Sequence, residues 1–555
     1  IFFSGSPFCP WSCHRCDGLL CAMQRVVFCL LLCCTLCHGT PNAPAAQWLL
    51  LELTASAAEL VDAADQPQPL RASEPVVAAD PNVAVYYHLN GKTILYGMPR
   101  DPRHDWGASH HPGRGLVHSE GQRAKGHLAM VIPSEATHLT VHMRDLTPGG
   151  TDPRRPVRQT LPVRASRAAP KRRFQPQATA DAAEVDILQM VGAPTDHLNL
   201  VFLSGGFTKA EKPNFQSAAD EALNFLEGNV SLGFMARPML PTPWDRYMPN
   251  VNVFSVFEAS AEHGASVAVD AYGHPGTGPV RVANNLGCAY GPSSPGVLEC
   301  EAGAMHRLAS RTSADPARTV LIALVNSATP GFSAVAGGRL SVYIGQQLTC
   351  AAGAPGCTDY GFHASRDNEF LSVFMRAFGH AVAGLADESA YNTSEPQRLP
   401  LPNCHWSATE QLPWQHWLDA GEVDPPAGPC GFANYVRPTG GRCLMGNANA
   451  PELCAVCVEH TIRTVYEATA RNAVPGPRCP REHEVMVVLH DAAVHYLAIA
   501  PRFYAAGVTR RRPRSYLAPY DWPAGTFPAD HPRRNGTTLP LRTDGGNVKI
   551  QWLWP

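Results

Sequence analysis

The sequence has few charged residues and almost no net charge. Asp, Glu, Lys and Arg make up 17% of the 555 residues, and the formal net charge is −2. A protein that binds nucleic acid or an anionic membrane through charge carries a basic surface, and this composition indicates none. Beyond residue 39 the chain also lacks a run of about 18 apolar residues. We therefore expect a soluble mature product without stable membrane insertion.

The first apolar run is too short to span a bilayer and is typical of a secretory signal. The chain begins with Ile1, and Met23 is followed by Arg25 and the apolar run 26–36. We expect residues 23–39 to be a signal peptide that is cleaved after Gly39. Residues 1–22 are then an untranslated or upstream extension, and the mature protein is secreted.

Cysteine usage agrees with export. Eight of the 18 cysteines precede residue 38, and the ten that follow are an even number. An even count in an exported chain predicts disulfides, although the sequence does not determine their pairing. Asn229, Asn392 and Asn535 begin N-glycosylation acceptor triplets, so the product is a glycoprotein if it passes through a eukaryotic secretory pathway.

The N-terminal part divides into three segments. Residues 40–80 are rich in Ala and Pro, and we expect low order there. Alternating patterns and the turn-forming pair Asn90-Gly91 predict a small β-sandwich over 81–148. Four histidines of this segment are expected to lie in loops and not to bind metal: His104, His110, His111 and His118. Residues 149–184 hold many arginines among prolines, which favours an exposed linker over a site of proteolytic processing.

A larger domain follows at 185–479. Buried strands are predicted at 197–203, 251–257, 319–327 and 337–344, with a helix after the first of them. This alternation predicts an α/β architecture. Residues 480–555 contain two more strand-like runs, at 485–489 and 494–499, and we assign this C-terminal extension no function.

The most informative segment of this domain is residues 369–388, EFLSVFMRAFGHAVAGLADE. Its apolar residues recur at helical spacing and predict an amphipathic helix that ends near Gly384. Arg376 and His380 are four residues apart and lie one above the other on the polar face. In a zinc helix of the H-E-x-x-H type both positions are histidines, and a glutamate follows the first. Here that glutamate position is Ala377.

This segment resembles the zinc metallopeptidase family named after an immunoglobulin-A peptidase, whose motif reads roughly H-E-F-G-H-x-x-x-x-L-x-D-E-Y. Other segments match the family in the same order, and the resemblance covers about residues 185–470. They are the strand and Ser204-Gly-Gly-Phe-Thr, Ser260-Ala-Glu-His-Gly, Tyr435-Val-Arg-Pro, Cys443-Leu-Met and Cys454-Ala-Val-Cys457. The resemblance implies a zincin-like domain preceded by a β-sandwich.

The resemblance also implies the roles of the site residues. Intact members bind Zn²⁺ through two histidines and an acidic residue, and the glutamate activates water. By position, His380 is the second ligand, and Asp387 or, second in preference, Glu388 is the acidic ligand. Arg376 replaces the first ligand and cannot bind a cation, and Ala377 cannot act as a base. We expect Arg376 to fill the space and to pair with Asp387.

Other residues offer little substitution for the lost ligand. Glu369 is three helical turns from His380, and His363 and His405 are expected in loops. The pair Cys454 and Cys457 forms a lone C-x-x-C, which is half of a zinc site, a redox pair or two disulfide partners of other cysteines. The exported context favours disulfides.

Three functions remain open from the sequence. The first is a secreted, catalytically impaired homologue of a zinc endopeptidase that binds a protein or peptide. The second is an active zinc endopeptidase with unusual ligands or with sequence errors at residues 376 and 377. The third is a glycan- or surface-binding protein that acts through residues 81–148.

Overall fold

The computed structural model describes most of residues 45–469 and two strands near the C-terminus, at 538–543 and 546–551. The predicted signal peptide and the strand-like runs at 485–489 and 494–499 lie outside the described residues. So do these internal segments: 67–75, 78–82, 112–114, 123–124, 147–155, 164–182, 229–240, 242, 268–279, 292–296, 328–330, 336, 346–367, 389–400, 407–411, 420–422, 427, 432–433, 448–449 and 451.

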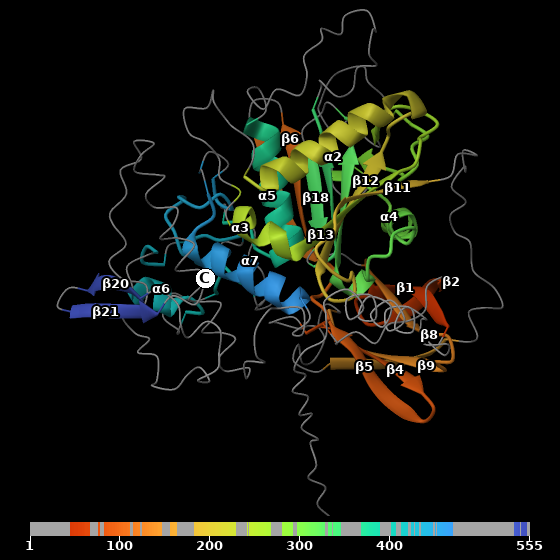
Figure 1. The fold of residues 1–555 in the computed structure, drawn as a ribbon, viewed down its shortest axis with the longest axis horizontal. Helices are drawn as coiled ribbons and strands as arrows, with labels where there is room; N and C mark the ends of the chain where they lie inside the picture. Colours follow the sequence, from red (N-terminus) through yellow and green to blue (C-terminus); the bar gives the residue numbers. More distant parts are fainter. Residues whose placement is uncertain are drawn as a thin grey trace, which may run out of the picture.

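The centre of the molecule is a mixed eight-stranded sheet with the order β11-β13-β12-β17-β19-β18-β6-β7 (Figure 1). The four strands β13, β12, β17 and β19 run parallel, and the outer strands run antiparallel to their neighbours. Their bounds are β11 Glu184–Gln189, β13 Val251–Phe257, β12 Leu198–Gly205, β17 Thr319–Val325, β19 Arg339–Tyr343, β18 Gly331–Val335, β6 His104–His111 and β7 Gly115–Gln122. The central strands are buried along their whole length, as expected for parallel strands covered on both faces.

Helices pack against this sheet, which makes the fold α/β. Helix α2 packs on β13 and β17, α4 on β12 and β17, and α5 on β18 and β19. Helix α7 lies against α5. The helices are α2 Lys212–Leu226, α3 Trp244–Tyr247, α4 Ala302–Ala309, α5 Asn368–Ala383, α6 Gln415–Asp419 and α7 Ala455–Ala468, with short 3-10 turns at Lys209–Glu211, Met248–Asn250 and Pro316–Arg318. The four predicted buried strands and the helix after the first of them are therefore confirmed.

The N-terminal part forms two further sheets that share one hydrophobic core. One has the order β2-β1-β8 and the other β10-β9-β4-β5-β3, and side chains of β1, β4, β8 and β9 meet between them. The strands are β1 Ala46–Thr54, β2 Ala58–Gln66, β3 Val76–Val77, β4 Val83–Leu89, β5 Lys92–Met98, β8 Lys125–Pro133, β9 His138–Arg144 and β10 Pro156–Pro162. Asn90 and Gly91 have φ of 50° and 73°, which confirms the predicted turn between β4 and β5.

Three features of the N-terminal region differ from the sequence prediction. The segment 40–80, expected to have low order, contains β1 and β2, and β1 is largely buried. Its alanine-rich composition hid the apolar run Trp48–Leu51, which lies in the middle of a sheet. Part of the predicted linker 149–184 is strand β10, paired with β9. The histidines expected in loops lie instead on β6 and β7, which extend the large sheet.

Two small sheets complete the described chain. Strands β14 Ser266–Val267, β15 Ala289–Tyr290 and β16 Leu298–Glu299 form a small sheet. Strands β20 Thr538–Thr543 and β21 Gly546–Gln551 form a separate antiparallel hairpin. None of the described helices is long and apolar enough to cross a membrane.

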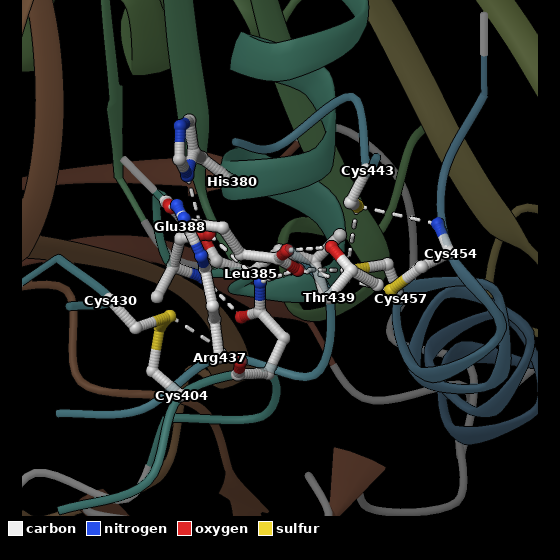
Figure 2. The surroundings of a disulfide bond; sticks show 12 residues. His380, Leu385, Glu388, Cys404, Cys430, Arg437, Thr439, Cys443, Cys454 and Cys457 are labelled. Carbon is white, nitrogen blue, oxygen red and sulfur yellow. Dashed lines mark hydrogen bonds between the residues drawn. A yellow bond between two sulfur atoms is a disulfide. The ribbon is translucent and has the colours of Figure 1, made fainter. Parts of the chain in front are cut away.

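Two disulfides hold loops of the large domain. Cys288 pairs with Cys300 near β15 and β16, and Cys404 pairs with Cys430 beside the end of α5. Figure 2 shows the second disulfide below Glu388, close to Arg437. Cys350, Cys357 and Cys479 lie outside the described residues. The expectation of disulfides is thus met for four of the cysteines.

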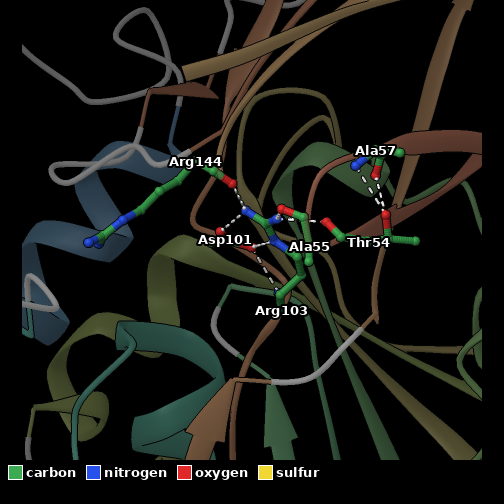
Figure 3. A network of polar contacts seen from close by, with 6 residues as sticks. All are labelled: Thr54, Ala55, Ala57, Asp101, Arg103 and Arg144. Atoms are coloured by element: carbon green, nitrogen blue, oxygen red, sulfur yellow. Dashed lines mark hydrogen bonds and ion pairs between the residues drawn. The ribbon is translucent and has the colours of Figure 1, made fainter. Parts of the chain in front are cut away.

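One buried arginine joins the segments of the N-terminal region (Figure 3). The side chain of Arg103 is fully buried and forms a two-pronged ion pair with Asp101, Nε to Oδ1 at 2.9 Å and Nη2 to Oδ2 at 2.6 Å. Its other N–H groups donate to the carbonyl oxygens of Thr54, Ala55 and Arg144. The turn after β1, the end of β9 and the start of β6 are therefore tied to one guanidinium group.

We predict that Arg103→Met lowers the free energy of unfolding by about 3–5 kcal/mol, because it leaves the Asp101 carboxylate buried without its cation. Urea unfolding measures the change. The control is Lys125→Met, which removes an ion pair with Glu52 from a side chain that is 51% exposed and is expected to change stability by less than about 1 kcal/mol. Equal effects of the two substitutions would contradict the assigned role of Arg103.

Candidate functional site

Helix α5 ends where the sequence predicts. Its last residue is Ala383, and Gly384 follows with φ of 63°, a left-handed conformation that ends the helix. A β-carbon on Gly384 would lie 2.3 Å from a guanidinium nitrogen of Arg100. The predicted polar face is not exposed, however, since every described side chain from Leu371 to Glu388 is buried. The helix is enclosed by α7 and by strands of the large sheet, including β6.

Arg376 and Asp387 form a buried ion pair. Arg376 Nη2 lies 2.6 Å from Asp387 Oδ2, and the two side chains are 2% and 1% exposed. The chain reversal after Gly384 brings Asp387 back alongside the helix. The pairing expected from the sequence is confirmed.

His380 is held one turn further along α5. Its Nδ1 donates to the carbonyl oxygen of Leu385 at 2.5 Å, a bond that fixes the ring. The ring stacks on Trp106 of β6, with centroids 4.8 Å apart and planes 14° apart, and on Phe332 of β18 at 5.9 Å. An Nδ1–H bond to a backbone carbonyl is common in metal-binding histidines. Here, however, aromatic side chains cover the ring.

These residues do not fit a catalytic zinc ion. Such an ion needs three protein ligands and an open position for water. Asp387 is engaged by the Arg376 guanidinium, which also repels a dication, and the buried side chain of Ala377 has no group that accepts a proton. Among the described residues, His380 and Asp387 belong to no group of three ligand atoms within 4.8 Å of one another.

Glu388 points to a different place from Asp387. Figure 2 shows its carboxylate directed towards Cys454 and Cys457 at the right, whereas His380 lies at the upper left. Glu388 Oε1 lies 3.3 Å from Cys457 Sγ and 3.8 Å from Cys454 Sγ. The two adjacent acidic residues therefore serve separate clusters, and Glu388 does not join the group around Arg376.

Three cysteines meet at this carboxylate, and all three are free thiols. Cys443, Cys454 and Cys457 are buried, and the Sγ atoms of Cys443 and Cys457 are 3.7 Å apart. The expectation that Cys454 and Cys457 form disulfides with other cysteines is therefore wrong in this structure. Cys454 occupies the N-cap position of α7 and Cys457 lies in the first turn of the helix. The C-x-x-C spacing therefore places both sulfurs at the same helix end.

Burial sets the ionisation of the cluster. It raises the pKa of Glu388 well above its usual range and likewise that of the Cys457 and Cys443 thiols. Burial also raises the pKa of Cys454, but hydrogen bonds from the other two thiols outweigh it and lower that pKa to about 6.

Neutral donors orient the carboxylate of Glu388. Asn403 Nδ2 donates to Oε1 at 3.1 Å and Thr439 Oγ1 donates to Oε2 at 3.2 Å. Asn403 also holds the backbone of Ala386 through both its oxygen and its nitrogen. The sequence did not predict this cluster. A zinc site was expected to need a second C-x-x-C, whereas Cys443 and Glu388 come singly from separate segments.

The other residues considered from the sequence do not rebuild the site. His405 stacks on Trp406 with centroids 4.1 Å apart, and its backbone pairs with Val436. The His104 ring packs against Trp106 in a tilted arrangement, with centroids 4.3 Å apart. His363 lies outside the described residues, and so do the side chains of Glu369, His110, His111 and His118.

A second polar cluster supports the loop after β12. Glu211 Oε2 accepts bonds from the backbone N–H and the hydroxyl of Thr208, and Oε1 lies 2.7 Å from Nδ1 of His263. The bond to Glu211 raises the pKa of His263 above 6.5. Partial burial raises the pKa of Glu211, but the bonds from His263 and Thr208 outweigh it and hold that pKa below 4.5.

Comparisons with known proteins give no identification, since no protein-family model and no curated protein matches the sequence. The argument for function therefore rests on the motif around His380 and on the geometry of its neighbours.

We predict that Arg376→Met destabilises the protein by about 3–5 kcal/mol, because Asp387 is then a buried charge without a partner. The double variant Arg376→Met/Asp387→Asn removes both charges and should recover much of the loss. Denaturant unfolding of the two variants and the parent gives the comparison. A single variant as stable as the parent would show that the ion pair does not organise this region.

The pair of Glu211 and His263 predicts a pH dependence. The raised pKa of His263 gives stability that is present below 6.5 and lost as pH rises through the higher folded value. The lowered pKa of Glu211 gives stability that is present above 4.5 and lost as pH falls through the lower folded value. The stability difference between the parent and His263→Gln should therefore be largest between pH 4.5 and 6.5. A difference that grows above pH 7 in unfolding titrations would contradict this.

Proposed function

We propose that this protein is a secreted, non-catalytic homologue of a zinc metallopeptidase of the immunoglobulin-A peptidase type, with its fold retained to bind a protein or peptide. The observation that carries the proposal is the buried ion pair between Arg376 and Asp387. It joins the residue at the first ligand position to the residue at the acidic ligand position. The likeness to the family motif supplies the assignment of these positions.

The chemistry of the replacement supports loss of catalysis. A zinc peptidase uses the metal to polarise the carbonyl and to lower the pKa of bound water, and a glutamate takes the proton of that water. Arginine stays protonated and does not bind metal, and alanine has no acceptor. Loss of a general base alone lowers the rate about 10²–10⁴-fold, and here the residues that would hold the metal are engaged elsewhere.

The covering of His380 supports the same conclusion. Strand β6 pairs antiparallel with β18 beside α5, and Trp106 lies opposite Ala334 in that register. The Trp106 ring stacks on the His380 ring, and both side chains are buried. Trp106 thus closes the face of the His380 ring on which it stacks.

The architecture is compatible with the proposed ancestry. Four parallel strands, an antiparallel strand β18 and helix α5 beside it are what we interpret as a zincin-like domain. The two N-terminal sheets with a shared core are interpreted as the accessory β-sandwich. The disulfides Cys288–Cys300 and Cys404–Cys430 support export to an oxidising compartment.

The edge strand β11 supports a protein or peptide as the partner. In the order of the described strands it pairs with β13 alone, so its outer backbone edge has no strand beside it. Val185 and Ile187 are 38% and 59% exposed on that strand. An exposed apolar edge is the kind of surface to which an extended peptide adds as a further strand.

We predict that the wild-type protein shows no chelator-sensitive hydrolysis of an unfolded protein substrate such as fluorescent casein. The double substitution Arg376→His/Ala377→Glu should raise the zinc content by one ion per chain over the parent, because it restores the first ligand and frees Asp387. Metal analysis of both proteins, purified without chelator, measures this difference.

The control for that experiment is the same double substitution combined with His380→Ala, which should not gain the extra ion. Wild-type hydrolysis that is abolished by a chelator and by His380→Ala would overturn the proposal. It would show that an active zinc site is formed in spite of Arg376.

A further inference from the structure

The cluster of Cys443, Cys454, Cys457 and Glu388 has the composition of a metal site. Each residue offers one ligand atom, and the four atoms lie within 4.8 Å of one another. They come from three segments: the turn after α5, the loop at 434–447 and the N-terminus of α7 (Figure 2). The predicted peptidase-type site at His380 and Asp387 does not account for this cluster of three sulfurs and a carboxylate oxygen.

The distances match a tetrahedral ion. A zinc ion with bonds of about 2.3 Å to sulfur and about 2.0 Å to oxygen places two sulfurs about 3.8 Å apart, and a sulfur and an oxygen about 3.5 Å apart. Cys443 Sγ and Cys457 Sγ are 3.7 Å apart. Glu388 Oε1 lies 3.3 Å from Cys457 Sγ and 3.8 Å from Cys454 Sγ. Three edges of the expected tetrahedron are therefore present.

A disulfide explains the cluster less well. The sulfurs of Cys443 and Cys457 would have to move from 3.7 Å to a covalent distance of about 2.05 Å. Three cysteines also cannot all pair with one another, so one buried thiol would remain. Free thiols are weak donors, and three of them with a carboxyl group gain little from mutual contact. A dication instead neutralises the thiolates and the carboxylate together.

The surroundings provide the support that a metal site needs. The N-terminus of α7 favours thiolates at Cys454 and Cys457. The backbone N–H of Cys454 donates to Cys443 Sγ at 3.3 Å. Asn403 and Thr439 fix the two carboxylate oxygens of Glu388. Such outer contacts orient ligands and tune affinity.

We propose that Cys443, Cys454, Cys457 and Glu388 bind one Zn²⁺ ion as a structural site. Thiolates in a tetrahedral arrangement select zinc among the common divalent ions. All four ligands come from the protein and all are buried, which is typical of a closed structural site and leaves no position for water. Binding releases the thiol protons and joins the end of α5 to the start of α7. The site is independent of the proposed loss of catalysis at Arg376.

The first test is metal analysis of the full chain, expressed through a secretory route and purified without chelator. We expect one zinc per chain, with Cys443, Cys454 and Cys457 all recovered as thiols in non-reducing peptide mapping. After zinc removal, Co²⁺ added alone should give the intense visible and near-ultraviolet bands of tetrahedral thiolate coordination. A chain that takes up neither metal, or that contains a disulfide between any two of these cysteines, would overturn the proposal.

Variants place the ion and separate this site from the catalytic position. Cys457→Ser should lose the zinc, and Thr439→Val, which removes only a bond to Glu388, should weaken binding about 10–100-fold. The matched control Cys288→Ser/Cys300→Ser removes two disulfide cysteines and should keep the zinc. His380→Ala should keep it as well. Zinc that is retained by Cys457→Ser but lost by His380→Ala would place the ion at the peptidase-type position and refute both proposals.

If Cys457→Ser does not fold, the Co²⁺ spectrum of the wild-type chain still decides, because its charge-transfer intensity reports the number of thiolate ligands. Three thiolates are expected. Bands without thiolate character would refute the site.

Discussion

The chain reversal at Gly384 is the constraint on which the rest of this region depends. It stops α5 after Ala383 and returns the chain so that the carbonyl of Leu385 meets His380 and the carboxylate of Asp387 meets Arg376. The next residue, Glu388, then faces α7 and its cysteines. A side chain at position 384 would collide with Arg100, which comes from the N-terminal region. One left-handed glycine thus sets the partners of two adjacent carboxylates.

Two buried ion pairs organise this protein in the same way. A lone Asp387 carboxylate in this environment would be expensive to bury, and Arg376 supplies the opposite charge from one turn before His380. Arg103 does the same for Asp101 in the N-terminal region, with every N–H group of its guanidinium bonded. In both places an arginine stabilises a carboxylate and joins segments that are distant in the sequence. Neither pair requires a metal ion.

The sequence predicted local structure well and long-range contacts poorly. The apolar run Thr319–Val325, the turn at Asn90-Gly91 and the helix end at Gly384 follow from local patterns, and the structure has each of them. The pairing of Arg376 with Asp387 was predictable because the likeness to the zinc-peptidase motif placed both residues at ligand positions of one site. The stacking of Trp106 on His380 was not, because no local pattern shows that β6 joins the large sheet. The cysteine cluster was missed for the same reason, as its ligands are up to 69 residues apart.

The two acidic residues after α5 therefore lie in sites of opposite character. Around Asp387 the partner is a permanent cation of the protein, so the pair is already neutral and its guanidinium repels a dication. Around Glu388 the partners are thiols, which lose protons to a metal and need one to balance the charge. A protein with this arrangement would contain zinc and still lack hydrolysis. The total zinc content of the protein therefore says nothing about catalysis. Comparing the zinc content of His380→Ala with that of Cys457→Ser shows which of the two sites holds the ion.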